Sequence, residues 1–206
     1  MVKVSEWNWD KPKRWRKLHT VADHVFWCYS VLTVTRTIME CVKAGRPHPY
    51  SGGRTKAANI VMSKYQKNLL TISNLDRDDA LSQMASPICA HCGNSAPAYH
   101  LDHLIPQSKL KSDYVGLNQV ISCPRCNTSR GNKDLMEWYR NNMTFPSLGV
   151  LRRYLKLCYF HAKQRGYLNL SVEEALQKGM PFDPSKFPEK FPPVSDLVWD
   201  YAYTET

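Results

Sequence analysis

The sequence predicts an α+β fold in which a small strand–strand–helix module is flanked by mainly helical segments. Apolar residues recur at helical spacing in both flanks. Between the flanks, two short stretches read as strands, and a helical stretch follows them. One Cys-x-x-Cys pair precedes the first strand, and a second pair follows the second strand. We expect a basic, mainly helical region over 1–86, the strand–strand–helix module over 87–144, and a helical region with a proline-rich tail over 145–206.

The N-terminal region is predicted to contain a basic arm followed by helices. Residues 1–18 interleave tryptophans with basic residues, including Lys13, Arg14, Arg16 and Lys17. Such an arm can stack on bases and contact phosphates, or it can be a solvated surface segment. Thr20 with Asp23 resembles a capping box, which starts a helix that should end at Gly45. Further helices are expected over about 55–70 and about 73–84.

In the central module, strands are predicted over 99–105 and 117–122, and a helix from Asn127 to about Asn141. In the C-terminal region, a helix should run from Ser147 to about Gln164, and a capping box at Ser171 begins another. The stretch 182–193 contains four prolines and is expected to be irregular.

The formal net charge of +10 and the pI near 9.3 favour a polyanionic partner, nucleic acid before a membrane surface. Residues 1–86 carry a net +7 of this charge, so the surplus lies ahead of the cysteine motif. The longest apolar stretch, from Val25 to about Val34, is stopped by Arg36, and we expect no membrane span.

The cysteine spacing predicts a structural zinc site. Four thiolates in two Cys-x-x-Cys pairs suit one tetrahedral Zn²⁺. His91 lies inside the first pair and is an alternative ligand, although four thiols are already present. Because thiol pairs bind zinc where the surroundings are reducing, and the first residues lack a signal-peptide pattern, we expect a cytoplasmic protein. The predicted zinc ligands are Cys89, Cys92, Cys123 and Cys126, while Cys28, Cys41 and Cys158 lie in apolar helical patterns and should be buried.

A second, harder cation is predicted at Asp102-His103, between the two cysteine pairs. An adjacent carboxylate and imidazole suit a divalent ion and a general base. Neighbouring strand residues point to opposite faces, so the two can serve one site only where the strand bends, and Pro106 makes such a bend plausible. Asn127 follows the last cysteine at the helix start.

These residues resemble the HNH endonucleases, the ββα-metal nucleases. The similarity is closest to the branch whose zinc is held by two Cys-x-x-Cys pairs, as in endonuclease VII and some HNH restriction enzymes. It spans about 45 residues: Ile88-Cys-Ala-His-Cys-Gly, then His100-Leu-Asp-His-Leu-Ile-Pro-Gln-Ser, then Leu117 through Lys133.

The resemblance implies a role for each matching position. Asp102 would bind a catalytic Mg²⁺ or Mn²⁺, and His103 would be the general base that activates water. Asn118 would brace the loop that carries the histidine. Asn127 stands where the family has a metal-binding His or Asn, and an amide oxygen suits Mg²⁺.

Other residues near the motif have open interpretations. His100 shares a strand face with Asp102 and is a candidate for the metal or the scissile phosphate, or it is a packed or solvated strand residue. Arg125, Arg130 and Lys133 are candidates for phosphate contacts, or ordinary solvated charges.

Two functions follow, from different classes. The first is a metal-dependent DNA endonuclease, with RNA a lesser possibility as substrate, acting in restriction, phage defence, junction resolution or a mobile element. Two cuts in a duplex often require two active sites, which favours a homodimer. The second is a non-catalytic, zinc-stabilised nucleic-acid-binding module. A pure binding module needs only the cysteines, so Asp102, His103 and Asn127 discriminate between the two.

Overall fold

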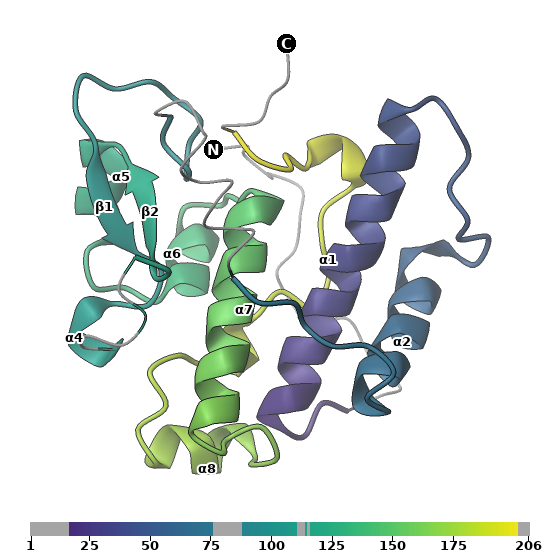
Figure 1. The fold of residues 1–206 in the computed structure, drawn as a ribbon. Helices are drawn as coiled ribbons and strands as arrows, with labels where there is room; N and C mark the ends of the chain where they lie inside the picture. Colours follow the sequence, from purple (N-terminus) through teal and green to yellow (C-terminus); the bar gives the residue numbers. More distant parts are fainter. Residues whose placement is uncertain (1–16, 76–87, 111–113, 115, 202–206) are drawn as a thin grey trace.

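The computed structural model describes residues 17–75, 88–110, 114 and 116–201. Figure 1 shows a small hairpin with short helices at one side of the molecule, two long helices beside it, and a further helix at the opposite edge. In order, the elements are α1 (Val21–Lys43), α2 (Gly53–Gln66), β1 (His100–His103), α4 (Gln107–Leu110), β2 (Gln119–Ser122), α5 (Pro124–Arg130), α6 (Leu135–Asn141), α7 (Leu148–Gln164), α8 (Val172–Gln177) and the 3₁₀ turns Pro184–Lys186 and Val194–Asp196.

The first helix begins at the predicted capping box. The Thr20 hydroxyl accepts a hydrogen bond from the Asp23 backbone N–H, and the Asp23 carboxylate accepts one from the Thr20 N–H. The helix ends before Gly45, whose φ of 61° is left-handed. The sequence led us to expect no membrane span, but α1 is long and apolar enough to cross a membrane by length and composition alone. Most of the apolar segment of α1 is buried inside the fold, as in the core helices of soluble proteins.

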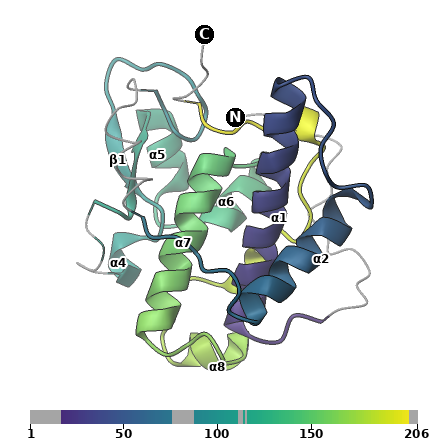
Figure 2. The ribbon, with the colours of Figure 1, turned by 45° about the vertical axis from the view of Figure 1, so that its right-hand side comes forward.

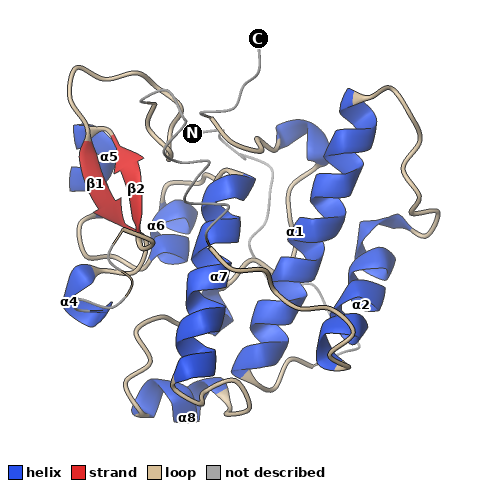
Figure 3. Ribbon diagram, viewed as in Figure 1, coloured by secondary structure: helices blue, strands red, loops and turns tan. Residues whose placement is uncertain are grey.

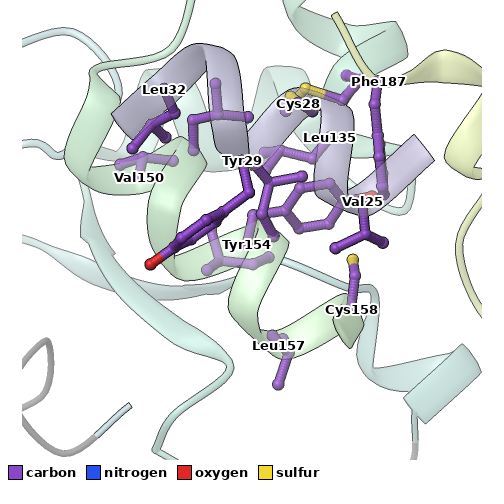
Figure 4. Packing of buried hydrophobic residues seen from close by; sticks show 14 of the residues in the cluster. Val25, Cys28, Tyr29, Leu32, Leu135, Val150, Tyr154, Leu157, Cys158 and Phe187 are labelled. Atoms are coloured by element: carbon purple, nitrogen blue, oxygen red, sulfur yellow. The ribbon is translucent and has the colours of Figure 1, made fainter. Parts of the chain in front are cut away.

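The core centres on α1, which packs against α2 on one side and α7 on the other. Figures 1 and 2 show α7 between the hairpin side of the molecule and α1, with α2 packed on the other side of α1. In Figure 4, Val25, Cys28 and Leu32 of α1 lie among side chains of α7 that include Tyr154 and Cys158. The prediction that three cysteines outside the motif are buried is confirmed for Cys28, Cys41 and Cys158.

The central module is built on a two-stranded antiparallel sheet (red in Figure 3). Its register pairs His100 with Ser122 and His103 with Gln119. Helix α5 packs on β1, which completes the predicted strand–strand–helix order. The connection between the strands contains α4, a short helix that the sequence pattern did not predict.

The prediction of a single helix from Asn127 to about Asn141 is wrong, because the structure has two helices there. Helix α5 ends at Arg130, because the next residue, Gly131, has a left-handed φ of 50° that leaves the α-helical path. Helix α6 then begins at Leu135, after its N-cap Asp134, whose carboxylate accepts hydrogen bonds from the backbone N–H groups of Met136 and Glu137.

The C-terminal region follows the prediction closely. Helix α7 is capped by Ser147, and α8 begins at the capping box of Ser171 and Glu174. The proline-rich stretch contains only a 3₁₀ turn and packs on the N-terminal helices: Trp27 donates a hydrogen bond to the Glu189 carbonyl at 2.8 Å, and Arg54 donates to the Pro192 carbonyl at 2.8 Å. The helix expected over about 73–84 lies almost wholly outside the described residues.

Candidate active site and zinc site

The four motif cysteines converge on one point. Their sulfur atoms all lie within 4.8 Å of one another, and Cys92 and Cys123 approach to 3.9 Å. The first pair belongs to a turn, residues 89–93, which we call the cysteine turn. The second pair lies at the start of α5, where Cys123 is the N-cap. The Ala90 N–H donates to the Ile121 carbonyl at 2.8 Å, so β2 holds the cysteine turn beside α5.

The electrostatics of the cluster suit a soft cation. Contact with Cys126 lowers the pKa of the Cys89 thiol to about 3, and the same contact raises the pKa of Cys126. Such opposed shifts arise when crowded thiols share protons. Four sulfur donors in this space fit a tetrahedral Zn²⁺, with Zn–S bonds of about 2.3 Å.

His91 is not one of the converging ligands. Its side chain is fully buried and its ring nitrogens contact other groups: Nδ1 lies 2.7 Å from the Tyr139 hydroxyl, and Nε2 lies 2.8 Å from Oδ2 of Asp102. The four cysteines therefore form the zinc site without the histidine.

Asp102 lies on β1 with its carboxylate turned inward, at 4% exposure. Its Oδ1 accepts a hydrogen bond from Nη1 of Arg130 at 2.5 Å, and Oδ2 contacts His91. Arg130 also donates to the Leu104 carbonyl at 2.7 Å. An arginine on α5 and a histidine in the cysteine turn thus hold the carboxylate from two sides.

The position of Arg130 differs from the sequence-based expectation of a phosphate contact. It is 1% exposed and forms a buried ion pair with Asp102. Its guanidinium binds the two acceptors described above, because α5 packs on β1 and turns this side chain into the module. Arg130 is therefore not among the proposed DNA contacts.

His103 follows Asp102 at the end of β1 and is half-buried. Its Nε2 lies 3.0 Å from Nε2 of Gln119, its partner in the sheet register. Just beyond, the amide of Asn118 contacts both backbone groups of Ile105 at 2.8 Å. The loop after the histidine is therefore fixed to β2 by an asparagine.

Asn127 and His100 form a separate contact at the surface. Nδ2 of Asn127 lies 3.1 Å from Nδ1 of His100, which joins α5 to the first residue of β1. His100 and Asp102 are two residues apart on β1, so they share one face of the strand. The structure thus brings His100, Asp102 and Asn127 to the side of β1 that faces α5.

The remaining basic candidates lie at the surface where they are described. Arg125, Lys133 and Lys17 are exposed, and the Lys133 ammonium donates to the Ser129 carbonyl. The other predicted contacts of the arm, Lys13, Arg14 and Arg16, lie outside the described residues.

Sequence reasoning missed the partners of the site residues. Gln119, Tyr139 and the inward role of His91 carry no motif signal of their own. The strand register places Gln119 opposite His103, so correct strand bounds would have found it. The contact between His91 and Tyr139 joins residues 48 positions apart and depends on how α6 packs.

Comparison with known families agrees with this geometry. Residues 89–133 match the model of the HNH endonuclease family, over the segment that holds the cysteine turn, β1, β2 and α5. No curated protein and no solved structure matches the chain. The matched segment is a minor part of 206 residues, and the flanking helices lie outside it. The chain contains an HNH endonuclease domain at residues 89–133, with four cysteines placed to bind zinc as in the zinc-containing branch of that family.

Proposed function

We propose that the protein is a metal-dependent DNA endonuclease that hydrolyses phosphodiester bonds at the module formed by β1, β2 and α5. The observation that carries the proposal is the arrangement around β1. Asp102, His100 and Asn127 gather on the side of β1 that α5 covers, and His103 follows at the strand end. The HNH family match supports nuclease chemistry at these residues.

A divalent ion such as Mg²⁺ or Mn²⁺ would be held by Asp102 and Asn127. An ionised carboxylate offers about four acceptor positions, and Asp102 uses two of them for Arg130 and His91. The carboxylate and the amide supply the hard oxygen donors that Mg²⁺ prefers. The Asn127 amide nitrogen contacts His100, and the amide oxygen is the atom that would bind the cation. When bound, the ion neutralises charge on the phosphate.

His103 would act as the general base. A neutral imidazole can take a proton from water as a general base. The Gln119 contact restrains the ring, and the Asn118 amide restrains the loop that follows it. We propose the fixed loop as the reason that the imidazole can be aimed at a water beside the phosphate.

DNA is the proposed substrate because the charge surplus suits a polyanion. The net charge is +10, and residues 1–86 carry most of the surplus. Lys17, Arg125 and Lys133 are exposed and available for phosphates. We propose the module over 87–144 as the catalytic unit and the basic region over 1–86 as the main source of DNA affinity.

The direct test is plasmid nicking by the full chain with Mg²⁺ or Mn²⁺, with EDTA as the negative control. His103→Ala should lose roughly 10²–10⁴-fold in cleavage rate while it keeps DNA binding. His48→Ala, an exposed histidine in the α1–α2 connection, is the matched control and should cleave normally. Wild-type cleavage by His103→Ala would remove the proposed base.

One observation favours a second function, a catalytically silent zinc-stabilised DNA-binding module. Asp102 is buried and both of its oxygens already accept hydrogen bonds, which is also the geometry of a purely structural carboxylate. This alternative predicts tight DNA binding and no cleavage with any divalent ion, so the nicking assay separates the two.

The proposed activity is compatible with several biological roles. Restriction, phage defence, junction resolution and mobile-element transfer all fit a short nuclease with basic flanks in the cytoplasm. Sequencing the products from a mixed DNA pool would separate site-specific from structure-specific cutting. Cleavage of both strands would favour a homodimer, which sedimentation of the protein with and without DNA would test.

A further inference from the structure

His91 is the most constrained histidine near the proposed site, and neither the zinc cluster nor the proposed cleavage step uses it. It lies in the cysteine turn between two zinc-binding positions, yet its ring is fully buried and its nitrogens contact Tyr139 and Asp102. The ring packs edge-on against Trp138, at 5.2 Å between centroids, and lies 5.8 Å from the Tyr139 ring. Helix α6 therefore fixes the plane of the imidazole.

In both hydrogen bonds of His91, the donor and the acceptor can be assigned. Burial raises the pKa of Tyr139 well above its usual range, so its hydroxyl stays protonated and can donate. An ionised Asp102 can only accept. One neutral tautomer satisfies both neighbours: Tyr139 donates to Nδ1, and Nε2–H donates to Oδ2 of Asp102. The chain of donors runs from α6 through the cysteine turn to β1.

Asp102 is consequently oriented by two donors that belong to different elements. Arg130 of α5 binds Oδ1, and His91 of the cysteine turn binds Oδ2. With each oxygen bound from a different element, the carboxylate cannot rotate without losing a buried hydrogen bond, which is costly. The remaining acceptor positions of Asp102 are therefore held in one direction.

We propose that His91 is a positioning residue that transmits the geometry of the zinc-bound cysteine turn to Asp102 and so sets the affinity of the site for the divalent ion. The inference rests on the proposed function, in which Asp102 binds that ion. The backbone of His91 lies between Cys89 and Cys92. Zinc bound to these cysteines would therefore fix the point from which the His91 imidazole reaches the Asp102 carboxylate. The zinc site then contributes orientation to the cleavage site as well as stability.

The test measures Mn²⁺ binding to the full-length protein without DNA, by paramagnetic resonance, with zinc content and thermal midpoint recorded for each variant. His91→Leu removes both hydrogen bonds and should weaken Mn²⁺ binding roughly 10–100-fold, the usual loss when a group that orients a metal ligand is removed. It should retain one zinc per chain, because the four cysteines remain. His91→Gln offers an amide N–H to Asp102 and should recover most of the affinity.

A control separates positioning from general destabilisation. Met62→Ala empties a fully buried position on α2, a helix that packs on α1 and lies outside residues 89–133, and should lower the thermal midpoint without changing Mn²⁺ binding. If His91→Leu does not fold, Tyr139→Phe takes its place, because it removes only the hydroxyl that donates to His91 and keeps the hydrogen bond from His91 to Asp102. Tyr139→Phe should weaken Mn²⁺ binding less than the loss predicted for His91→Leu.

The outcomes distinguish this inference from the proposed function. Wild-type protein that holds zinc but binds no Mn²⁺ would overturn the proposed function and the inference with it. Wild-type protein that binds Mn²⁺ while His91→Leu, or Tyr139→Phe in its place, binds equally well would overturn the inference alone. An affinity loss in Met62→Ala as large as that in the His91 variant would also overturn it.

Discussion

The side-chain amide of Asn118 pairs with the backbone of Ile105 as a neighbouring strand would. Its oxygen accepts from the Ile105 N–H and its nitrogen donates to the Ile105 carbonyl, both at 2.8 Å. The Leu104 N–H also donates to the Asn118 carbonyl at 2.8 Å. The pairing of the hairpin thus continues beyond His103 through a side chain, and it fixes the start of the loop that contains α4.

Asn118→Ala should therefore destabilise the protein and impair cleavage. Asn118 is 2% exposed, and its removal leaves two buried backbone groups of Ile105 unpaired, each at a cost of about 1–3 kcal/mol. The free energy of unfolding, from urea titration, should fall accordingly. Asn59→Ala is the matched control, because this half-buried amide of α2 donates only one hydrogen bond, to the Thr55 carbonyl of its own helix, and the change should cost about 1 kcal/mol or less. Equal stability of the two variants would contradict the bracing role.

Loss of a zinc ligand should unfold the module. Cys126→Ser removes one of four sulfurs that lie within 4.8 Å of one another, and structural zinc contributes on the order of 10–16 kcal/mol to folding. Elemental analysis of the dialysed wild type should find about one zinc per chain, and the variant should be zinc-free with weakened near-ultraviolet dichroism. Cys41→Ser, a buried cysteine of α1 outside the cluster, is the control and should keep its zinc. An active, zinc-free wild type would refute the zinc site.

The ligands of the catalytic ion should be separable from those of zinc. Asn127→Ala should abolish cleavage and leave the zinc bound, since the amide is a hard donor and the cluster is made of sulfur. It is a cleaner variant than Asp102→Asn, because Asn127 is half-buried whereas Asp102 neutralises buried Arg130. Breaking that buried pair should cost about 3–5 kcal/mol of stability in addition to activity. Release of zinc from Asn127→Ala would show that the two sites share ligands.

The sequence predicted the parts of this fold that depend on neighbouring residues. The capping boxes at Thr20 and Ser171 are local, so the helices begin where they were expected. The break between α5 and α6 also had a local signal, because Gly131 and the N-cap Asp134 both interrupt the helix, but the apolar spacing hid it. The network of His91, Asp102 and Arg130 was not predictable, because it depends on how α5 and the cysteine turn pack on β1.

DNA affinity should depend on the basic arm while catalysis should not. Deleting residues 1–16 removes Lys3, Lys11, Lys13, Arg14 and Arg16 together with Glu6 and Asp10, a net loss of three positive charges. The deletion keeps Leu18, which packs on the core, and the capping residue Thr20. If the lost residues neutralise phosphates, the slope of log K against log salt should become shallower by roughly 0.9 per lost contact.

A second variant with the same change in net charge tests whether the position of the lost charges matters for DNA binding. Replacing Lys163, Lys178 and Lys190 with glutamine also removes three positive charges, from exposed positions in the C-terminal region. Its salt slope should stay near that of the wild type if the arm makes the contacts, because contacts to phosphates and not net charge determine the slope. At saturating DNA and low salt both proteins should cleave normally, since neither change touches β1, β2 or α5. An unchanged slope in the truncated protein would make the arm a solvated segment and would move the DNA-binding surface to the folded part of the chain.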